Sequence, residues 1–169
     1  MITGSIARRY ARALFELAQE ADRTDKVERD LEGFVAGIHQ VPEVWRSLTN
    51  PGFSRDERRN LVEKLLPHFS LEQTTANFLR LLLDKGRIDH LDAIAREYRG
   101  LNDEHQKRVR ARVRSAVALT ESDLSRLKTL LQQVTGRTVL LQHEVDEDLI
   151  GGMVTEVGGL LFDGSLRTQ

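Results

Sequence analysis

Residues 108–117, RVRARVRSAV, decide the fold class of this chain. Apolar or small side chains alternate with polar ones at every second position, which is the period of a β-strand with one buried face. Thr120 then opens a segment with leucines at helical spacing, which ends before Gly136. Two further strands are expected at 138–145 and at about 153–162. This half of the sequence therefore predicts a small α+β module.

The half of the chain that precedes this strand has the period and the end signals of helices. Ser54 with Glu57, and Ser70 with Gln73, have the spacing of a capping box, and Asp89 is expected to cap a later helix. We therefore predict an N-terminal six-helix bundle followed by the C-terminal α+β module. The predicted domains are 1–105 and 106–169, and the helices are expected at about 5–21, 24–39, 42–48, 54–66, 70–84 and 89–101.

Composition limits the class of protein. The chain has 169 residues, a formal net charge of −1 and no cysteine, so disulfides and thiolate metal sites are excluded. This charge creates no global field towards nucleic acid or anionic lipid. Charged residues interrupt the N-terminal apolar pattern, unlike a signal peptide, and no run approaches the roughly 18 apolar residues of a membrane span. We expect a soluble, cytosolic protein that reaches a membrane only through a partner.

The first and fifth predicted helices have apolar arcs of about 200° and 220°, whereas a surface helix on a single core needs roughly 100°. One interpretation is that both helices are central and covered by the other four. The other is that part of each arc forms a groove for an amphipathic helix of another protein. Composition and periodicity leave both interpretations open. The candidate groove residues are Tyr10, Ala13, Leu17, Phe78, Leu81 and Leu82.

The sequence contains no arrangement typical of catalysis, of a metal site or of a cofactor site. Its five histidines are scattered, without a His-x-x-x-His pair or carboxylates at ligand spacing. The glycines at 151–152 and 158–159 form neither a phosphate-binding loop nor a dinucleotide fingerprint, and we interpret them as turn or bulge glycines. We therefore expect a non-catalytic protein without metal or cofactor.

Arg108, Arg110, Arg112 and Arg114 lie on one face of the predicted strand. A nucleic-acid surface would need interleaved aromatic side chains, which are missing, so no nucleic-acid partner is expected. A solvated strand face is the favoured interpretation. A docking face for an acidic helix, with Arg110 and Arg112 as contacts, is the second.

Short motifs along the whole chain resemble one family, the bacterial ATP synthase delta subunits, which are similar to the mitochondrial oligomycin-sensitivity-conferring protein. The most specific feature is the pair Leu-Ile-Gly-Gly and Asp-Gly-Ser after a helical N-terminal half. The motifs are ARRYARALFELA (7–18), FLRLL (78–82), KGRI (85–88), VRSA (113–116), TGR (135–137), VDEDLIGG (145–152) and FDGS (162–165).

The resemblance implies a stator connector that couples proton-driven rotation to ATP synthesis at the cytoplasmic face of a bacterial membrane. The family's N-terminal bundle takes the N-terminal helix of an alpha subunit between its first and fifth helices, which favours the groove. Its C-terminal module binds the distal C-terminal region of the b subunits, so the basic strand and the segment 166–169 are expected at the stalk end. A helix-binding adaptor outside ATP synthase and an RNA-binding accessory domain are the alternatives.

Overall fold

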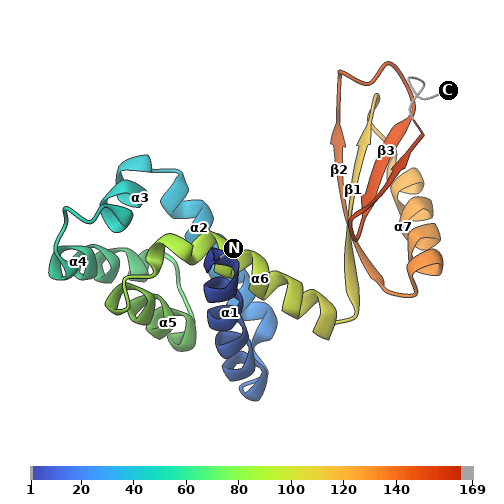
Figure 1. Ribbon diagram of the computed structural model, residues 1–169. Coiled ribbons are helices and arrows are strands. Elements are labelled where there is room, and N and C mark those ends of the chain that lie inside the picture. The colour runs from blue at the N-terminus through green and yellow to red at the C-terminus, as the bar shows by residue number, and fades with distance from the viewer. Residues whose placement is uncertain (1, 165–169) are drawn as a thin grey trace. The chain divides into compact units, whose positions relative to one another are not determined.

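The computed structural model describes the backbone of residues 2–164 and the side chains of residues 4–164. The chain divides into two compact units, Met1–Asn102 and Asp103–Gln169, which are described separately below. The first unit is helical, and the second contains a four-stranded sheet with a helix packed on it (Figure 1). The predicted α+β class is confirmed. That residues 1–105 fold on their own stays a prediction.

The first unit is made of α-helices joined by short connections, two of which contain a 3₁₀ turn. Its last helix, α6, continues to His105 and so passes into the second unit. The bounds are α1 Ile2–Glu20, α2 Thr24–His39, α3 Pro42–Thr49, α4 Arg55–Leu65, α5 Gln73–Asp84 and α6 Leu91–His105, with the 3₁₀ turns η1 Leu66–His68 and η2 Ile88–His90.

Helix α4 begins at the capping box that the sequence predicts. The Glu57 N–H donates to Ser54 Oγ at 3.2 Å, and the Ser54 N–H donates to Glu57 Oε2 at 2.8 Å. Because these two bonds satisfy backbone donors that a helix start leaves unpaired, the cap fixes where α4 begins. The Ser54 N–H and the Ser54 hydroxyl, which both donate to Glu57 Oε2, lower the pKa of the Glu57 carboxyl group below its ordinary value.

Helix α5 does not begin as predicted. Ser70 lies in the preceding loop with φ of 48°, and Gln73 is the first residue of the helix, so these two residues form no capping box. The cap comes instead from another helix, because the Asp30 carboxylate on α2 accepts the Glu72 N–H at 2.7 Å. Asp89 likewise lies within η2 rather than at the start of α6.

The core of the first unit gathers apolar side chains from α1, α2, α5 and α6. The rings of Phe15 and Tyr98 pack edge to face with centroids 5.6 Å apart. Tyr98 is fully buried, and its hydroxyl donates to the Thr24 carbonyl at 3.1 Å, so the one polar atom of this ring has a partner. Burial raises the pKa of Tyr98. Other fully buried side chains are Leu14, Leu31, Phe34, Leu79, Leu82 and Ile94.

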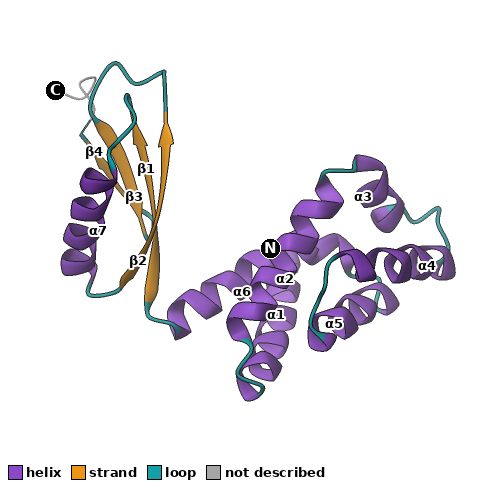
Figure 2. Ribbon diagram, turned by 180° about the vertical axis from the view of Figure 1, so that it is seen from behind, coloured by secondary structure: helices purple, strands orange, loops and turns teal. Residues whose placement is uncertain are grey.

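The second unit holds a sheet with the strand order β2-β1-β3-β4 (Figure 2). Strands β1 and β2 are parallel and are joined by a crossover through α7, while β3 and β4 are added antiparallel. The Ala111, Leu131, Val139 and Val157 side chains form a small core between sheet and helix. The bounds are β1 Arg108–Ser115, α7 Glu121–Thr135, β2 Thr138–Val145, β3 Met153–Val157 and β4 Leu160–Asp163.

The predicted strand at 153–162 is wrong in one respect, because it is a hairpin of two strands. Gly158 and Gly159 have φ of 56° and 86° and form the turn between β3 and β4. A two-residue hairpin turn of this kind needs positive φ at both central positions, which glycine adopts without strain. The predicted limits of α7 are confirmed, with Thr120 at its N-cap and Gly136 after its end, and the structure adds Asp123 as the partner of Thr120 in a capping box.

Candidate partner-binding surfaces

Helices α1 and α5 lie side by side in the first unit (Figure 1, Figure 2). The Tyr10 ring on α1 meets the Phe78 ring on α5 edge to face, with centroids 6.3 Å apart. Tyr10 is half-buried and Phe78 is 7% exposed. This aromatic pair therefore marks the line along which the core of the unit meets solvent.

The structure separates the six candidate groove residues into exposed and buried ones. Leu17 is 56% exposed and Leu81 is 42% exposed, and Ala13 is also open to solvent. Leu82 is 0% exposed, so it belongs to the core and cannot touch a partner on this surface. We define the α1/α5 strip as the remaining five residues, namely Tyr10, Ala13, Leu17, Phe78 and Leu81.

Most of the wide apolar arcs is core. On α1 the small side chains Ala7, Ala11 and Ala18 are at most 1% exposed, so they let neighbouring helices approach closely. On α5 Leu79 and Leu83 are buried in the same core. The large exposed apolar side chains are Leu17, two turns after Tyr10 on α1, and Leu81, one turn after Phe78 on α5. They are informative because Tyr10 and Phe78 are in contact.

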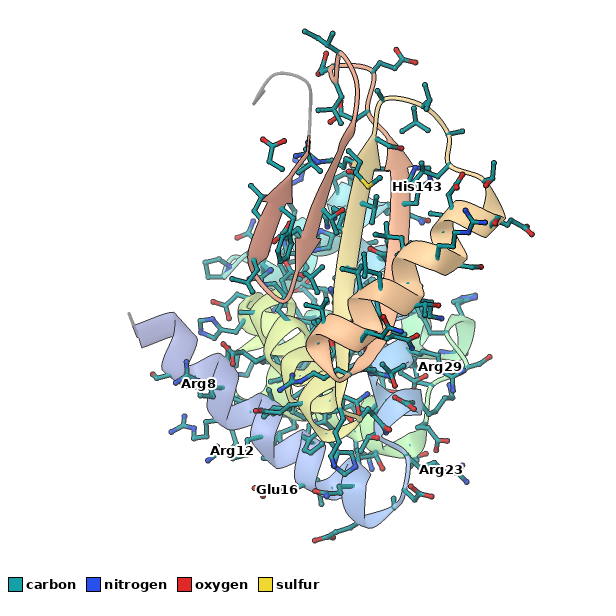
Figure 3. The ribbon with its side chains drawn as sticks, turned by 90° about the vertical axis from the view of Figure 1, so that its right-hand side faces the viewer. Arg8, Arg12, Glu16, Arg23, Arg29 and His143 are labelled. Atoms are coloured by element: carbon teal, nitrogen blue, oxygen red, sulfur yellow. The ribbon has the colours of Figure 1, made fainter. Side chains whose placement is uncertain are left out.

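Charged side chains lie on the same two helices as the strip. The Arg80 guanidinium on α5 holds the Glu63 carboxylate of α4 with two bonds of 2.6 and 2.8 Å. This pairing lowers the pKa of Glu63 and raises that of Arg80. Arg12 and Glu16 lie along one side of α1 (Figure 3). On α1 the apolar strip residues thus share the helix with a charged side, an arrangement compatible with receiving one face of an amphipathic helix.

The arginines of β1 do not form an open basic face. One carboxylate serves two of them, because Asp103 accepts Arg108 Nε at 2.6 Å and Arg110 Nε at 2.7 Å. Arg114 pairs with Asp146 at 2.9 Å. Arg112 is exposed, and Glu156 stands directly opposite it on β3. This local pairing removes most of the positive field, which disfavours a nucleic-acid surface.

A second apolar surface, which the sequence reading missed, lies beside α7. Leu130 on α7 is 55% exposed and lines a cavity of about 340 Å³ together with Met153 of β3 and Leu127. On β4, Leu160 and Phe162 are 67% and 52% exposed. Strand register places Met153, Leu160 and Phe162 on the sheet face that α7 covers in part. We name Leu130, Val134, Met153, Leu160 and Phe162 the α7/hairpin surface.

Two signals could have revealed this surface. The sequence prediction did not separate the apolar side chains of α7 by face, whereas the structure packs Leu127 and Leu131 on the sheet and exposes Leu130 and Val134. Apolar side chains on α7 cover more of the helix than one sheet face can bury, so part of them stays exposed to solvent. The Gly158-Gly159 turn is the second signal, because a hairpin there adds a fourth strand to the sheet. One helix does not cover all four strands, so apolar side chains on the fourth strand stay exposed.

Two of the histidines, His39 and His143, make side-chain contacts within the fold. His39 Nε2 lies 2.9 Å from Asp92 Oδ1, and its ring lies 4.9 Å from the Trp45 ring. His143 Nε2 lies 2.7 Å from Ser115 Oγ, on the sheet of the second unit (Figure 3). Among residues 2–164 no cluster of three or more histidine, aspartate or glutamate side chains could hold a metal ion. Within the same range no helix is both long and apolar enough to cross a bilayer.

Comparison with known proteins identifies the family of this chain. The family described as ATP synthase delta (OSCP) subunit matches residues 6–169. The chain belongs to this family. Among its relatives, the ATP synthase subunit delta of Anaeromyxobacter sp. (strain Fw109-5) is 48% identical over the whole chain and 94% of the relative. That of Myxococcus xanthus (strain DK1622) is 44% identical with the same coverage of both chains.

The fold of this delta-family chain also has a counterpart among solved structures. A chain of the Toxoplasma gondii mitochondrial ATP synthase hexamer matches with a TM-score of 0.72, covering 96% of this chain and 91% of the other. The two are 20% identical in sequence, so this match speaks for the fold. The delta-family fold is thus present throughout the chain. Arg110 and Arg112 lie on the sheet of the second unit, and their contact with a partner stays a prediction. The segment 166–169 lies outside the described residues.

Proposed function

We propose that this protein is a non-catalytic connector of the stator of an F-type ATP synthase. The observation that carries the proposal is membership of the delta family over residues 6–169, with relatives named ATP synthase subunit delta at 37–48% identity. Two apolar surfaces, one on each compact unit, support it because a connector must hold two partners at once. Its place is the cytoplasmic face of a bacterial cell membrane, reached through the complex.

The first partner is the N-terminal helix of an ATP synthase alpha subunit, bound on the α1/α5 strip. Tyr10, Ala13 and Leu17 follow one another at spacings of three and four residues, which aligns them along one face of α1. From Tyr10 to Leu17 the face runs about 10 Å, or two turns of helix. A guest helix with apolar residues at i, i+3, i+4 and i+7 can match this length, and Ala13 leaves room for its backbone.

The second partner is the C-terminal region of the ATP synthase b subunits, bound by the second unit. The α7/hairpin surface supports this assignment, because it offers exposed Leu130, Phe162 and a shallow cavity to an apolar side chain. A helix laid beside α7 would cover apolar area that the small core of this unit leaves open. Arg110 and Arg112 remain the alternative contact, on the opposite sheet face.

The mechanism is mechanical rather than chemical. A connector that holds both the catalytic head and the stalk keeps the head from turning with the rotor, so rotation changes the conformation of catalytic sites instead. High affinity at both surfaces is what this role requires, since torque acts continuously on both contacts. The alternatives differ in their partners, because an adaptor outside ATP synthase would bind other helices and an RNA-binding domain would show salt-dependent RNA affinity.

The test is to immobilise the full chain and expose it to detergent extracts of the bacterial membranes. We expect alpha and b subunits to be retained together, and a strip variant, Leu17→Asp, to lose alpha but keep b. Retention of neither subunit by the unmodified protein would refute the connector role. Retention of both by the variant would move the alpha contact away from the strip.

A further inference from the structure

The start of helix α5 is held by a buried carboxylate from helix α2. Asp30 is 4% exposed, and its Oδ2 accepts the Glu72 N–H at 2.7 Å and the Thr75 hydroxyl at 3.1 Å. Glu72 precedes α5 directly, yet its own side chain makes no capping bond. Helix α5 is therefore capped across the bundle, by a residue 42 positions earlier in the sequence.

Lys26 completes this arrangement one turn before Asp30. Its ammonium group bonds to Asp30 Oδ1 and also donates to the Ser70 carbonyl at 3.2 Å. A buried carboxylate is costly unless it is paired and hydrogen-bonded, and here it has a cation, an N–H and a hydroxyl. The negative charge also lies at the N-terminus of α5, where the helix dipole favours it.

The capped helix is the one that carries half of the strip. Phe78 follows Thr75 by one turn and packs against Tyr10, and Leu81 follows by a second turn. The bonds from Asp30 fix the first turn of α5 against α2. They therefore also fix the position of Phe78 and Leu81 relative to α1. Because Asp30 lies inside the bundle, it can act on a guest helix only through the position of α5.

We propose that Asp30 is a positioning residue of the α1/α5 strip, which keeps α5 in the place where the strip accepts a helix. The inference rests on the proposed function, since the guest helix is part of that proposal. When a binding-competent position is populated for only a fraction of the time, the apparent dissociation constant rises by the reciprocal of that fraction. Loss of the cap is expected to reduce this population and so to weaken binding about tenfold.

Four variants of the full chain separate positioning from stability. Asp30→Asn removes the charge, Thr75→Val removes the hydroxyl donor at constant shape, and Thr75→Ser keeps it. Ser54→Ala is the matched control, because it removes a helix cap of the same kind from α4, which carries no strip residue. The probe is a peptide with the sequence of the alpha subunit's N-terminal helix, titrated by calorimetry well below the unfolding temperature.

We expect Asp30→Asn and Thr75→Val to weaken peptide binding about tenfold, and Thr75→Ser and Ser54→Ala to stay within about twofold. A second measurement needs no peptide: the nuclear Overhauser contact between the Tyr10 and Phe78 rings, together with hydrogen exchange in the first turn of α5. Asp30→Asn should weaken the contact and speed the exchange. Wild-type contact and exchange in that variant, or an affinity no different from Ser54→Ala, would overturn the inference. Failure of the unmodified protein to bind the peptide would refute the alpha-subunit partner instead, and the ring contact would still decide whether Asp30 positions α5.

Discussion

Tyr10 and Phe78 meet edge to face across α1 and α5, and their contact separates the bundle core from an exposed apolar band. On the inner side, Leu82 is fully buried. On the outer side, Leu17 and Leu81 are open to solvent. The wide apolar arcs are thus core in one part and exposed to solvent in another. That the exposed part receives a partner helix stays a prediction, which experiments can address separately.

The sharpest test of the strip is Ala13→Asp. Ala13 is exposed in the free protein, so the new carboxylate stays hydrated and folding should change by less than about 0.5 kcal/mol. In the complex the carboxylate would be desolvated against an apolar guest helix. A cost of about 3 kcal/mol would weaken binding of the alpha-subunit peptide roughly a hundredfold, which calorimetry measures directly.

The control for this variant is Ala11→Asp, on the same helix but fully buried. It should unfold the first unit or lower its stability by several kcal/mol, because it places an unpaired charge in the core. Thermal melts of the two variants should therefore differ sharply. Normal peptide affinity in a folded Ala13→Asp protein would place the alpha contact elsewhere.

The helical unit is predicted to fold alone. A fragment of residues 1–105 contains the complete core around Phe34, Leu79 and Tyr98 and every cap of its own helices. Circular dichroism should show a single cooperative melt of helical signal. A fragment without cooperative melting would mean that the second unit is needed for folding.

The two candidate stalk contacts can be separated because they lie on opposite sheet faces. Leu130→Glu should weaken binding of a C-terminal b-subunit fragment by at least about tenfold, since it puts a charge into an apolar contact. Arg112→Glu should change the affinity by less than about twofold, because the Arg112 side chain is exposed on the other sheet face; its repulsion from Glu156 should appear as a modest loss of stability instead.

Arg110 is a poor probe of the same question. Its partner Asp103 would repel a glutamate at that position, so Arg110→Glu should lower stability whether or not a partner binds there. A thermal melt of each variant serves as the control that the second unit is folded, and peptide binding on the α1/α5 strip should stay unchanged in all of them. A large loss in Arg112→Glu with normal binding in Leu130→Glu would assign the stalk to the arginine face.

The capping carboxylates Glu57 and Asp123 should stabilise α4 and α7 only while they are ionised, so acid should weaken both helix starts. Hydrogen bonds from Ser54 to Glu57 and from Thr120 to Asp123 lower the pKa of both carboxyl groups in the folded state. Each therefore stabilises the fold at a pH above the pKa of the unfolded chain, and this contribution disappears as the pH falls through the lower, folded pKa. In urea titrations, Glu57→Gln should be less stable than wild type at pH 7, and the difference should shrink near about pH 3. A difference that stays constant with pH would mean that the Glu57 charge has no part in the cap.

Local signals in the sequence were sufficient where both partners lie within a few residues of each other. The capping box of α4 was predicted because such a box spans only four residues, and Thr120 and Gly136 were predicted as the limits of α7 from their residue types. The α+β class followed from the change of period at residue 108. These features depend on the backbone of one short segment, so no tertiary information is needed to place them.

Contacts between distant segments were not predictable in this way. The cap of α5 comes from Asp30, so the Ser70–Gln73 spacing was misleading. The strand alternation placed the β1 arginines on one face but could not show that Asp103 and Asp146 neutralise them. The burial of the candidate groove residues was likewise not predictable, because Leu81 and Leu82 are neighbours in sequence but one is exposed and the other buried.

The β3–β4 hairpin has a consequence for how the protein behaves before assembly. Strand β4 ends the strand order of the described sheet, and Leu160, Leu161 and Phe162 are three consecutive exposed apolar side chains on it. An apolar strand at the end of a sheet is a template for pairing with another chain, and no proline interrupts β4. The protein without its partner should therefore aggregate with time at high concentration. Early binding of the partner over this surface would prevent that aggregation as well as serve assembly.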